Sequence, residues 1–253
     1  MKQDEKGTLD LWRATEAQVM EGWEFSHLKG RMRGEPLPWD YTALLLRHLR
    51  PDHRLLDMGT GGGEFLLTLG HPYHNTSVTE NWPPNFALCR RRLAPLGIAV
   101  RQAPNDLLPY GDAQFDIVAN RHESYDMKEV CRVLRPGGLF LTQQVGGENN
   151  RALSERLIRG FVPPYPNHNL QAALAEAEAA GLTVLDRGEA HPVLSFADIP
   201  ALIAFAKAIP WEFPDFSVEA CLAPLRQLQQ ELEREGEVRS TEHRFYLLCR
   251  RDG

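Results

Sequence analysis

The sequence predicts a doubly wound α/β fold, and three observations carry this prediction. Short apolar stretches alternate with stretches of helical spacing between residues 54 and 145, as is typical of parallel strands joined by crossover helices. The first apolar stretch runs directly into a glycine turn, 59–63. Polar residues follow several of the predicted strands, at the sheet edge where open α/β folds bind ligands.

The core elements are predicted in alternating order. The expected strands are 54–58, 76–80, 99–102, 115–120 and 139–144, and the expected helices are 63–69, 85–94 and 127–134. Pro83 and Pro84 suit the entry of the helix over 85–94, because proline is tolerated in a first helical turn. The parallel connections should be right-handed.

Further helices are predicted on both sides of this core. Thr8 is expected to cap a helix over 9–22, and Ser217 to cap a late one reaching about residue 235. The other expected elements are helices 41–49, 153–160, 170–180 and 196–209, and strands 182–186 and 243–250. We expect a single domain over 1–253, made of an N-terminal helical arm or lid (1–50), a cofactor-binding core (51–148), a helical elaboration with a sixth strand (149–240) and a closing strand (241–253).

The charge of the glycine turn indicates the kind of ligand. Asp57 and Glu64 flank the turn and no lysine lies in it, so a pyrophosphate would meet two like charges. A cofactor with an ammonium and a sulfonium would be attracted, which points to S-adenosylmethionine. Glu64 also replaces the third glycine of the dinucleotide-binding pattern G-x-G-x-x-G, which disfavours a nicotinamide cofactor.

Ordered motifs over residues 54–145 resemble those of the class I S-adenosylmethionine-dependent methyltransferases. They are the turn 57–63, Glu80 at the end of the second strand, the run 108–119 and the turn 129–138. The resemblance implies a Rossmann-like, seven-stranded sheet in which the C-terminal strand is antiparallel. It also implies methyl transfer from S-adenosylmethionine, with S-adenosylhomocysteine as the product.

The resemblance assigns most cofactor contacts. Asp57 is expected to hold the amino group of the methionine part, and Glu80 to accept both ribose hydroxyls, since a carboxylate offers two oxygens. The backbone of Gly59 and Gly61 should line the cofactor. The remaining candidates on the cofactor side are Thr60, Asn81, Asn120 and Arg121.

The adenine contact departs from the family pattern. Pro104 stands where an aspartate often contacts the adenine amino group, and proline has no backbone N–H. Asp106 is the favoured substitute and Asn105 the second choice.

Glu80 has an alternative interpretation. Its side chain could be a solvated strand end without a cofactor role.

His122 is the candidate catalytic residue. It follows the strand 115–120, and its ordinary pKa lies near neutrality, so it suits a general base. The alternative is an orienting hydrogen bond within the loop. Gln143 and Gln144 are unusual in a strand buried on both faces, and one of them is expected to reach the active site. The candidates for substrate contacts are the aromatic residues Trp39, Tyr41 and Trp211.

Bulk composition limits the function classes. The net charge of −6 argues mildly against nucleic acid as an obligatory partner. The four cysteines form no CxxC pair, so we expect neither a zinc site nor a disulfide framework. No stretch reads as a signal peptide or a membrane span, and a cytoplasmic location is expected.

We therefore predict a methyltransferase that acts on a small molecule. One alternative keeps the chemistry but makes the acceptor an RNA base, and another is an S-adenosylmethionine-binding protein without turnover.

Overall fold

The structure is a computed structural model that describes residues 2–18, 28–104 and 107–253. Contacts divide the chain into two compact units. The core unit comprises residues 38–146, 168–189 and 244–253, and the accessory unit comprises residues 1–37, 147–167 and 190–243. The arm predicted over 1–50 is thus divided between the two units at residue 37.

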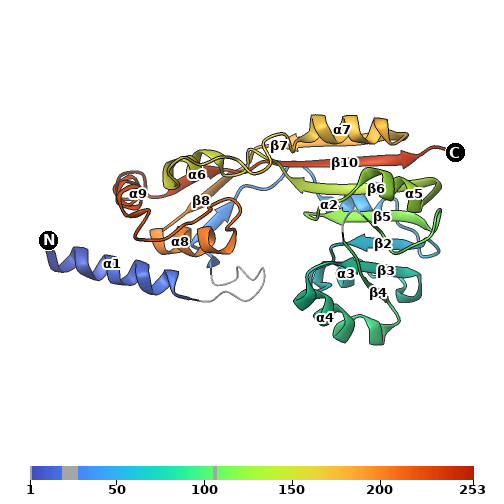
Figure 1. The fold of residues 1–253 in the computed structure, drawn as a ribbon, viewed down its shortest axis with the longest axis horizontal. Helices are drawn as coiled ribbons and strands as arrows, with labels where there is room; N and C mark the ends of the chain where they lie inside the picture. The colour runs from blue at the N-terminus through green and yellow to red at the C-terminus, as the bar shows by residue number, and fades with distance from the viewer. Residues whose placement is uncertain (1, 19–27, 105–106) are drawn as a thin grey trace. The chain divides into compact units, whose positions relative to one another are not determined.

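The core unit is built on a seven-stranded sheet in the order β4-β3-β2-β5-β6-β10-β7 (Figure 1). Strands β2 to β6 pair in parallel, and β10 is antiparallel to β6. This topology confirms the predicted fold class, including the antiparallel C-terminal strand. The strands are β2 (Leu55–Met58), β3 (Thr76–Glu80), β4 (Ala99–Gln102), β5 (Phe115–Arg121), β6 (Leu134–Val145), β7 (Leu182–Ala190) and β10 (Arg244–Arg251).

The helices of the core unit begin where polar side chains meet free backbone N–H groups. Asp40, Asp126 and Asn169 each accept a hydrogen bond from the first turn of the helix that follows. The helices are α2 (Tyr41–Leu46), α3 (Glu64–Thr68), α4 (Pro83–Arg92), α5 (Met127–Val133) and α7 (Leu170–Ala179), with 3-10 turns η2 (Tyr73–Asn75) and η3 (Ala94–Leu96). The prolines predicted at the entry of α4 occupy its first turn.

Apolar side chains cover both faces of the central strands. Leu56 and Val118 belong to one buried cluster, and their neighbours Leu55 and Ile117 to another. Successive residues of a strand point to opposite faces, so this division shows that β2 and β5 are buried on both sides. Polar groups therefore concentrate at the strand ends, where the candidate site lies.

The accessory unit contains a small sheet that the sequence analysis did not predict. Its order is β1-β8-β9, and both pairings are antiparallel. Its strands have three or four residues, which is too few to show a clear alternation of apolar and polar residues in the sequence. The elements of this unit are α1 (Lys2–Glu16), β1 (Met32–Gly34), α6 (Arg151–Leu157), β8 (Val193–Phe196), α8 (Ile199–Ala208), α9 (Leu222–Glu235) and β9 (Val238–Thr241).

Three predicted helix starts in the accessory unit are wrong. Thr8 lies inside α1 and does not cap it. The helix predicted from residue 196 begins at Ile199, because Phe196 ends β8 and the Asp198 carboxylate caps the helix. The last helix begins at Leu222, beyond Ser217. No described helix is both long and apolar enough to cross a membrane.

Candidate functional site

The glycine turn after β2 leads into α3 and lies beside the end of β3. Gly59 and Gly61 have φ of 64° and 61°, a left-handed conformation that glycine adopts without strain. The backbone N–H groups of Gly59 and Thr60 both donate to the Thr79 carbonyl, at 3.0 and 3.2 Å. The turn is therefore tied to the neighbouring strand, at the carboxyl edge of the sheet.

Gly59 also leaves room for a side chain that the sequence analysis missed. A Cβ at this position would lie 2.4 Å from both Cβ and Cγ of Glu123 and 2.6 Å from its Oε2. Glu123 thus packs directly over the turn, two residues after β5 ends. Its place next to His122 was the available signal, but only the folded chain brings it to Gly59.

Replacing Gly59 by alanine should destabilise the protein more than the same change at Gly70. Both glycines have nearly equal φ, 64° and 65°, but a Cβ at Gly70 meets no atom within 4 Å. Each variant should lose about 1–2 kcal/mol of stability from the left-handed backbone, and Gly59→Ala about 1–3 kcal/mol more from the clash with Glu123. Urea unfolding of both variants measures the difference, and equal losses would contradict the close packing.

The Gly61 peptide is held from two sides. Its N–H donates to Glu80 Oε2 at 2.8 Å, and its carbonyl accepts from Cys89 Sγ at 2.7 Å. Burial raises the pKa of Cys89 to about 12, which keeps the thiol proton available for this hydrogen bond. The turn is consequently preorganised by β3 and α4.

Glu80 is a buried carboxylate with only 4% of its surface exposed. Its Oε2 accepts from Gly61, and its Oε1 accepts from the Trp82 N–H at 3.0 Å. The alternative of a solvated strand end is therefore wrong. Each carboxylate oxygen accepts more than one hydrogen bond, so both retain capacity for a ligand hydroxyl.

Asp57, at 4% exposure, lies beneath the same turn. Burial raises its pKa to about 6, an effect that Glu80 reinforces and that Thr60 and Arg121 oppose. The Thr60 hydroxyl is near enough to Asp57 to lower the pKa of that carboxyl. It nevertheless makes no hydrogen bond of normal geometry with a described residue. A ligand cation beside Asp57 would stabilise the ionised carboxylate.

Glu64 weakens the charge argument drawn from the sequence. Its side chain is exposed and forms an ion pair with Arg92. Burial works to raise the pKa of Glu64, but hydrogen bonds from Arg92 and from its own backbone outweigh it and lower the pKa. The negative charge expected from Glu64 is thus compensated by Arg92, and the acids that belong to the site are Asp57, Glu80 and Glu123.

Asn120, at the end of β5, is fully buried. Its Oδ1 accepts from Thr142 Oγ1 at 3.2 Å and from Gln144 Nε2 at 2.7 Å. Its Nδ2 is buried without a hydrogen-bond partner among the described residues. Gln144 therefore makes the structural bond expected of one of the two glutamines.

His122 occupies an unusual backbone conformation just after β5. Its φ is 64°, and its backbone N–H donates to the Gln143 carbonyl at 2.8 Å. Surrounding protein atoms desolvate the imidazolium and lower the pKa of His122, and repulsion from Arg244 and Arg121 adds to this. Solvent still reaches the side chain, so the residue is placed to meet a ligand.

The remaining predicted residues lie in different surroundings. Arg121 places its guanidinium 4.1 Å from the centre of the Phe65 ring. Asn81 is exposed, and its carbonyl accepts from Gln102. Tyr41 is buried, with its hydroxyl within 3.2 Å of the carbonyls of Asn120 and Leu141, so it has no exposed face for a substrate.

Two groups of candidates fall outside the core unit's described residues. Trp211 belongs to the accessory unit and is 44% exposed. Asn105 and Asp106 lie outside the residues that the structure describes, so the adenine contact stays a prediction. No group of three or more described histidines, cysteines or acids is arranged to hold a metal ion.

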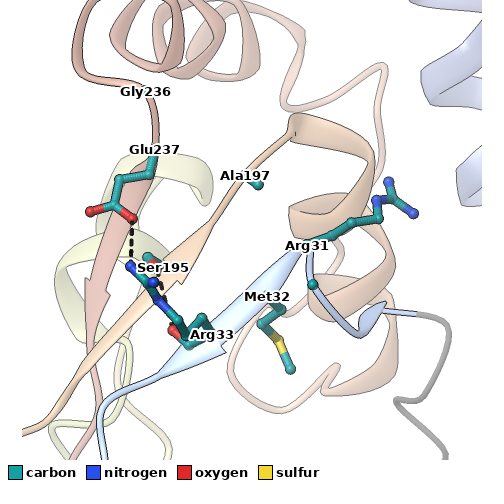
Figure 2. Close-up of a pocket in the computed structure, with 8 residues that line it drawn as sticks. Arg31, Met32, Arg33, Ser195, Ala197, Gly236 and Glu237 are labelled. Atoms are coloured by element: carbon teal, nitrogen blue, oxygen red, sulfur yellow. Dashed lines mark hydrogen bonds and ion pairs between the residues drawn. The ribbon is translucent and has the colours of Figure 1, made fainter.

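The accessory unit carries a separate hollow of about 470 Å³, between β1, β8 and the turn before β9. Figure 2 shows Arg33 linked to Glu237 and to Ser195, while Arg31 turns away from both. Arg31 instead pairs with Asp198 at 2.6 Å, and Arg33 lies 3.9 Å from Glu237. Each charged side chain of this hollow thus has an oppositely charged partner within the protein.

Comparisons with known proteins agree with the geometry of the core unit. Residues 56–142 match a family model described as a methyltransferase domain. A demethylmenaquinone methyltransferase of Thermus thermophilus is 32% identical over 116 residues, which cover 42% of this chain and 53% of the relative. The chain spans about half the length of the curated relatives it matches.

Solved structures share the fold at low sequence identity. The YcgJ protein of Bacillus subtilis is 15% identical with a TM-score of 0.58, covering 84% of this chain and 98% of that one. An N-methyltransferase of Haemonchus contortus is 16% identical with a TM-score of 0.52, covering 84% of this chain and 52% of that one. It was solved with phosphomonomethylethanolamine and S-adenosylhomocysteine. The family match and the shared fold confirm the resemblance inferred from the sequence motifs.

Proposed function

We propose that this chain, whose residues 56–142 match a methyltransferase-domain family model, binds S-adenosylmethionine and transfers its methyl group to a small organic acceptor. The observation that carries the proposal is the pair of buried carboxylates, Asp57 and Glu80, at one positive-φ glycine turn. An adenosine cofactor with a ribose diol and an ammonium group matches both.

The residues present fit this cofactor. Asp57 would hold the ammonium group, since a buried carboxylate with a raised pKa gains from an adjacent cation. Glu80 would accept the ribose hydroxyls on the oxygens that already orient Gly61 and Trp82. Asn120 Nδ2, which has no hydrogen-bond partner among the described residues, is a further polar group at this edge. When bound, the cofactor supplies an electrophilic methyl group on a positively charged sulfur.

The protein's own contribution is positioning. Gly59, Gly61 and Glu80 set the turn against which the cofactor lies, and Asn120 and Arg121 end the adjacent strand. Holding the acceptor in line with the methyl carbon, with water excluded, supplies most of the rate enhancement expected for such a displacement. We place His122 on the acceptor side, because solvent reaches its ring.

A small-molecule acceptor is supported by two observations. The chain has a net charge of −6, which disfavours binding to a polyanion. The relative from Thermus thermophilus is named for demethylmenaquinone, and the Haemonchus contortus enzyme was solved with phosphomonomethylethanolamine. An RNA base and a role without turnover have no specific observation in their favour.

Calorimetric titration with S-adenosylhomocysteine tests the cofactor site. We expect saturable binding at one site, and no binding of NAD under the same conditions. Incubation with a methyl-labelled donor and a fractionated cell extract then shows which fraction is labelled. Label in the small-molecule fraction supports the proposal; binding of NAD and not of S-adenosylhomocysteine would overturn the cofactor assignment, and label confined to RNA the acceptor class.

A further inference from the structure

Trp39 fixes the orientation of a neighbouring amide. The indole N–H is a donor only, and Trp39 Nε1 lies 2.8 Å from Gln143 Oε1. The two ends of a glutamine amide are otherwise hard to distinguish, but here the donor identifies the acceptor. The oxygen of Gln143 must face Trp39, and its NH₂ group must face the other way.

The NH₂ group of Gln143 in turn identifies the protonation state of His122. Gln143 Nε2 lies 3.0 Å from His122 Nε2. An amide NH₂ only donates, so His122 Nε2 must present a lone pair. A neutral imidazole with an unprotonated Nε2 carries its hydrogen on Nδ1.

The surroundings of His122 also disfavour its protonated imidazolium form. An imidazolium would set its Nε2–H against the donor amide of Gln143. Desolvation, together with the positive charges of Arg244 and Arg121, lowers the pKa of His122 in the same direction. The backbone bond from His122 N to the Gln143 carbonyl holds the loop against β6, so ring and backbone are positioned by the same residue.

We infer that Trp39 and Gln143 hold His122 as its neutral Nδ1–H tautomer, and that His122 donates a hydrogen bond to a methyl acceptor that arrives as an oxyanion. The tautomer stands on the hydrogen bonds alone, whereas the acceptor class rests on the proposed function. The lone pair that a general base would need is engaged by Gln143, and Nδ1 has no hydrogen-bond partner among the described residues. Arg121 ends β5 and Arg244 begins β10, the two strands that flank β6, and both place positive charge near His122.

The chemistry of an oxyanion acceptor requires no base. A lone pair of the phenolate or carboxylate oxygen forms the new bond to the methyl carbon, while the carbon–sulfur bond breaks and its electron pair returns to sulfur. A sulfonium and an anion become a neutral thioether and a neutral ether or ester, and no proton is released. His122 therefore binds and orients the nucleophile, and Trp39 and Gln143 are positioning residues.

Nitrogen-15 spectra of histidine-labelled protein test the tautomer directly. In the wild type we expect His122 to show a protonated Nδ1 and an unprotonated Nε2, assigned by loss of its signals in His122→Asn. Gln143→Glu should reverse the tautomer, because a carboxylate accepts from both Trp39 Nε1 and His122 Nε2. Gln171→Glu, the same change at an exposed position of α7, should leave the spectrum as it is.

Two results would overturn the tautomer assignment. One is a protonated Nε2 in the wild type, and the other is a Gln143→Glu protein that folds, as judged by its melting curve, yet keeps the wild-type pattern. Trp39→Phe offers a second variant if Gln143→Glu does not fold. It frees the amide to rotate and should give a mixture of tautomers.

The acceptor class is tested on protein loaded with S-adenosylhomocysteine. 2,4-Dinitrophenolate should shift the His122 Nδ1–H signal and bind at least roughly tenfold more tightly than neutral 2,4-dinitroanisole, as expected for a charge-assisted hydrogen bond. His122→Phe should abolish that preference. Equal binding of the two probes would overturn the oxyanion assignment, whereas failure to load S-adenosylhomocysteine would overturn the proposed function and leave the tautomer result intact.

Discussion

Asp57→Asn should make the ligand-free protein more stable at pH 8 while weakening its binding of S-adenosylhomocysteine. Burial raises the pKa of Asp57 from 3.8 to about 6, so the folded state holds this proton more tightly than the unfolded chain. The resulting stabilisation is complete below pH 3.8 and is lost as the pH rises through about 6. Above that range the ionised carboxylate opposes folding by up to about 3 kcal/mol, and a neutral amide removes this penalty.

Urea unfolding at pH 8 and at pH 4 checks the stability half of this prediction. The free energy of unfolding of the variant should exceed that of the wild type at pH 8. The gain should be much smaller at pH 4, where Asp57 is mostly protonated in the folded wild type. Asp52→Asn, at a largely exposed side chain of the core unit, is the matched control and should change little. A loss of stability at pH 8 would show that ionised Asp57 supports the fold.

The binding half follows from the ammonium group of the cofactor. Removing the charged partner of a hydrogen-bonded cation should weaken binding on the order of 10–100-fold. For the wild type, affinity should also fall as the pH drops below about 6, since protonated Asp57 no longer attracts the ammonium. Calorimetry across this pH range measures both effects; unchanged affinity in Asp57→Asn would remove Asp57 from the ammonium role.

Glu80→Ala should weaken both the fold and the cofactor site, in contrast to Asp57→Asn. The substitution removes the acceptor for two backbone N–H groups, those of Gly61 and Trp82. Both hydrogen bonds are part-buried, so each donor left without its acceptor costs up to about 1–3 kcal/mol. The loss should therefore appear in the free energy of unfolding even without ligand, and binding of S-adenosylhomocysteine should decrease further because the ribose acceptor is missing.

Glu80→Gln separates these contributions. Its carbonyl oxygen satisfies one N–H, while its NH₂ group faces the other, so its stability should fall between those of the wild type and Glu80→Ala. Glu178→Ala, an exposed acid on α7, is the control for loss of a surface charge. Wild-type stability in Glu80→Ala would mean that the turn does not depend on this carboxylate.

The core sheet was predictable because its signals are local. Apolar stretches of a few residues, the glycine turn 59–63 and capping residues such as Asp126 each depend on neighbours close in the chain. The seven-stranded sheet and its antiparallel last strand followed from the resemblance that these motifs carry. Asp57 and Glu80 were identified as site residues by the same motifs, and their cofactor roles remain predictions.

Contacts between distant residues were not predictable in this way. The three-stranded sheet joins residues 32–34 with 193–196 and 238–241, and no local pattern in such short strands indicates the partners. Glu123 over Gly59 and the chain of hydrogen bonds from Trp39 to His122 are likewise made by residues from separate elements.

The sequence alone determined which residues form turns, which are apolar and which carry charge, because these are properties of single residues and of short stretches of sequence. The tertiary structure decided what those charges do. Burial raised the pKa of Asp57, and Arg92 compensated the charge of Glu64. Gln143 donates a hydrogen bond to the Nε2 lone pair of His122. Each of these depends on solvent exclusion and on partners that only the folded chain brings within hydrogen-bonding distance.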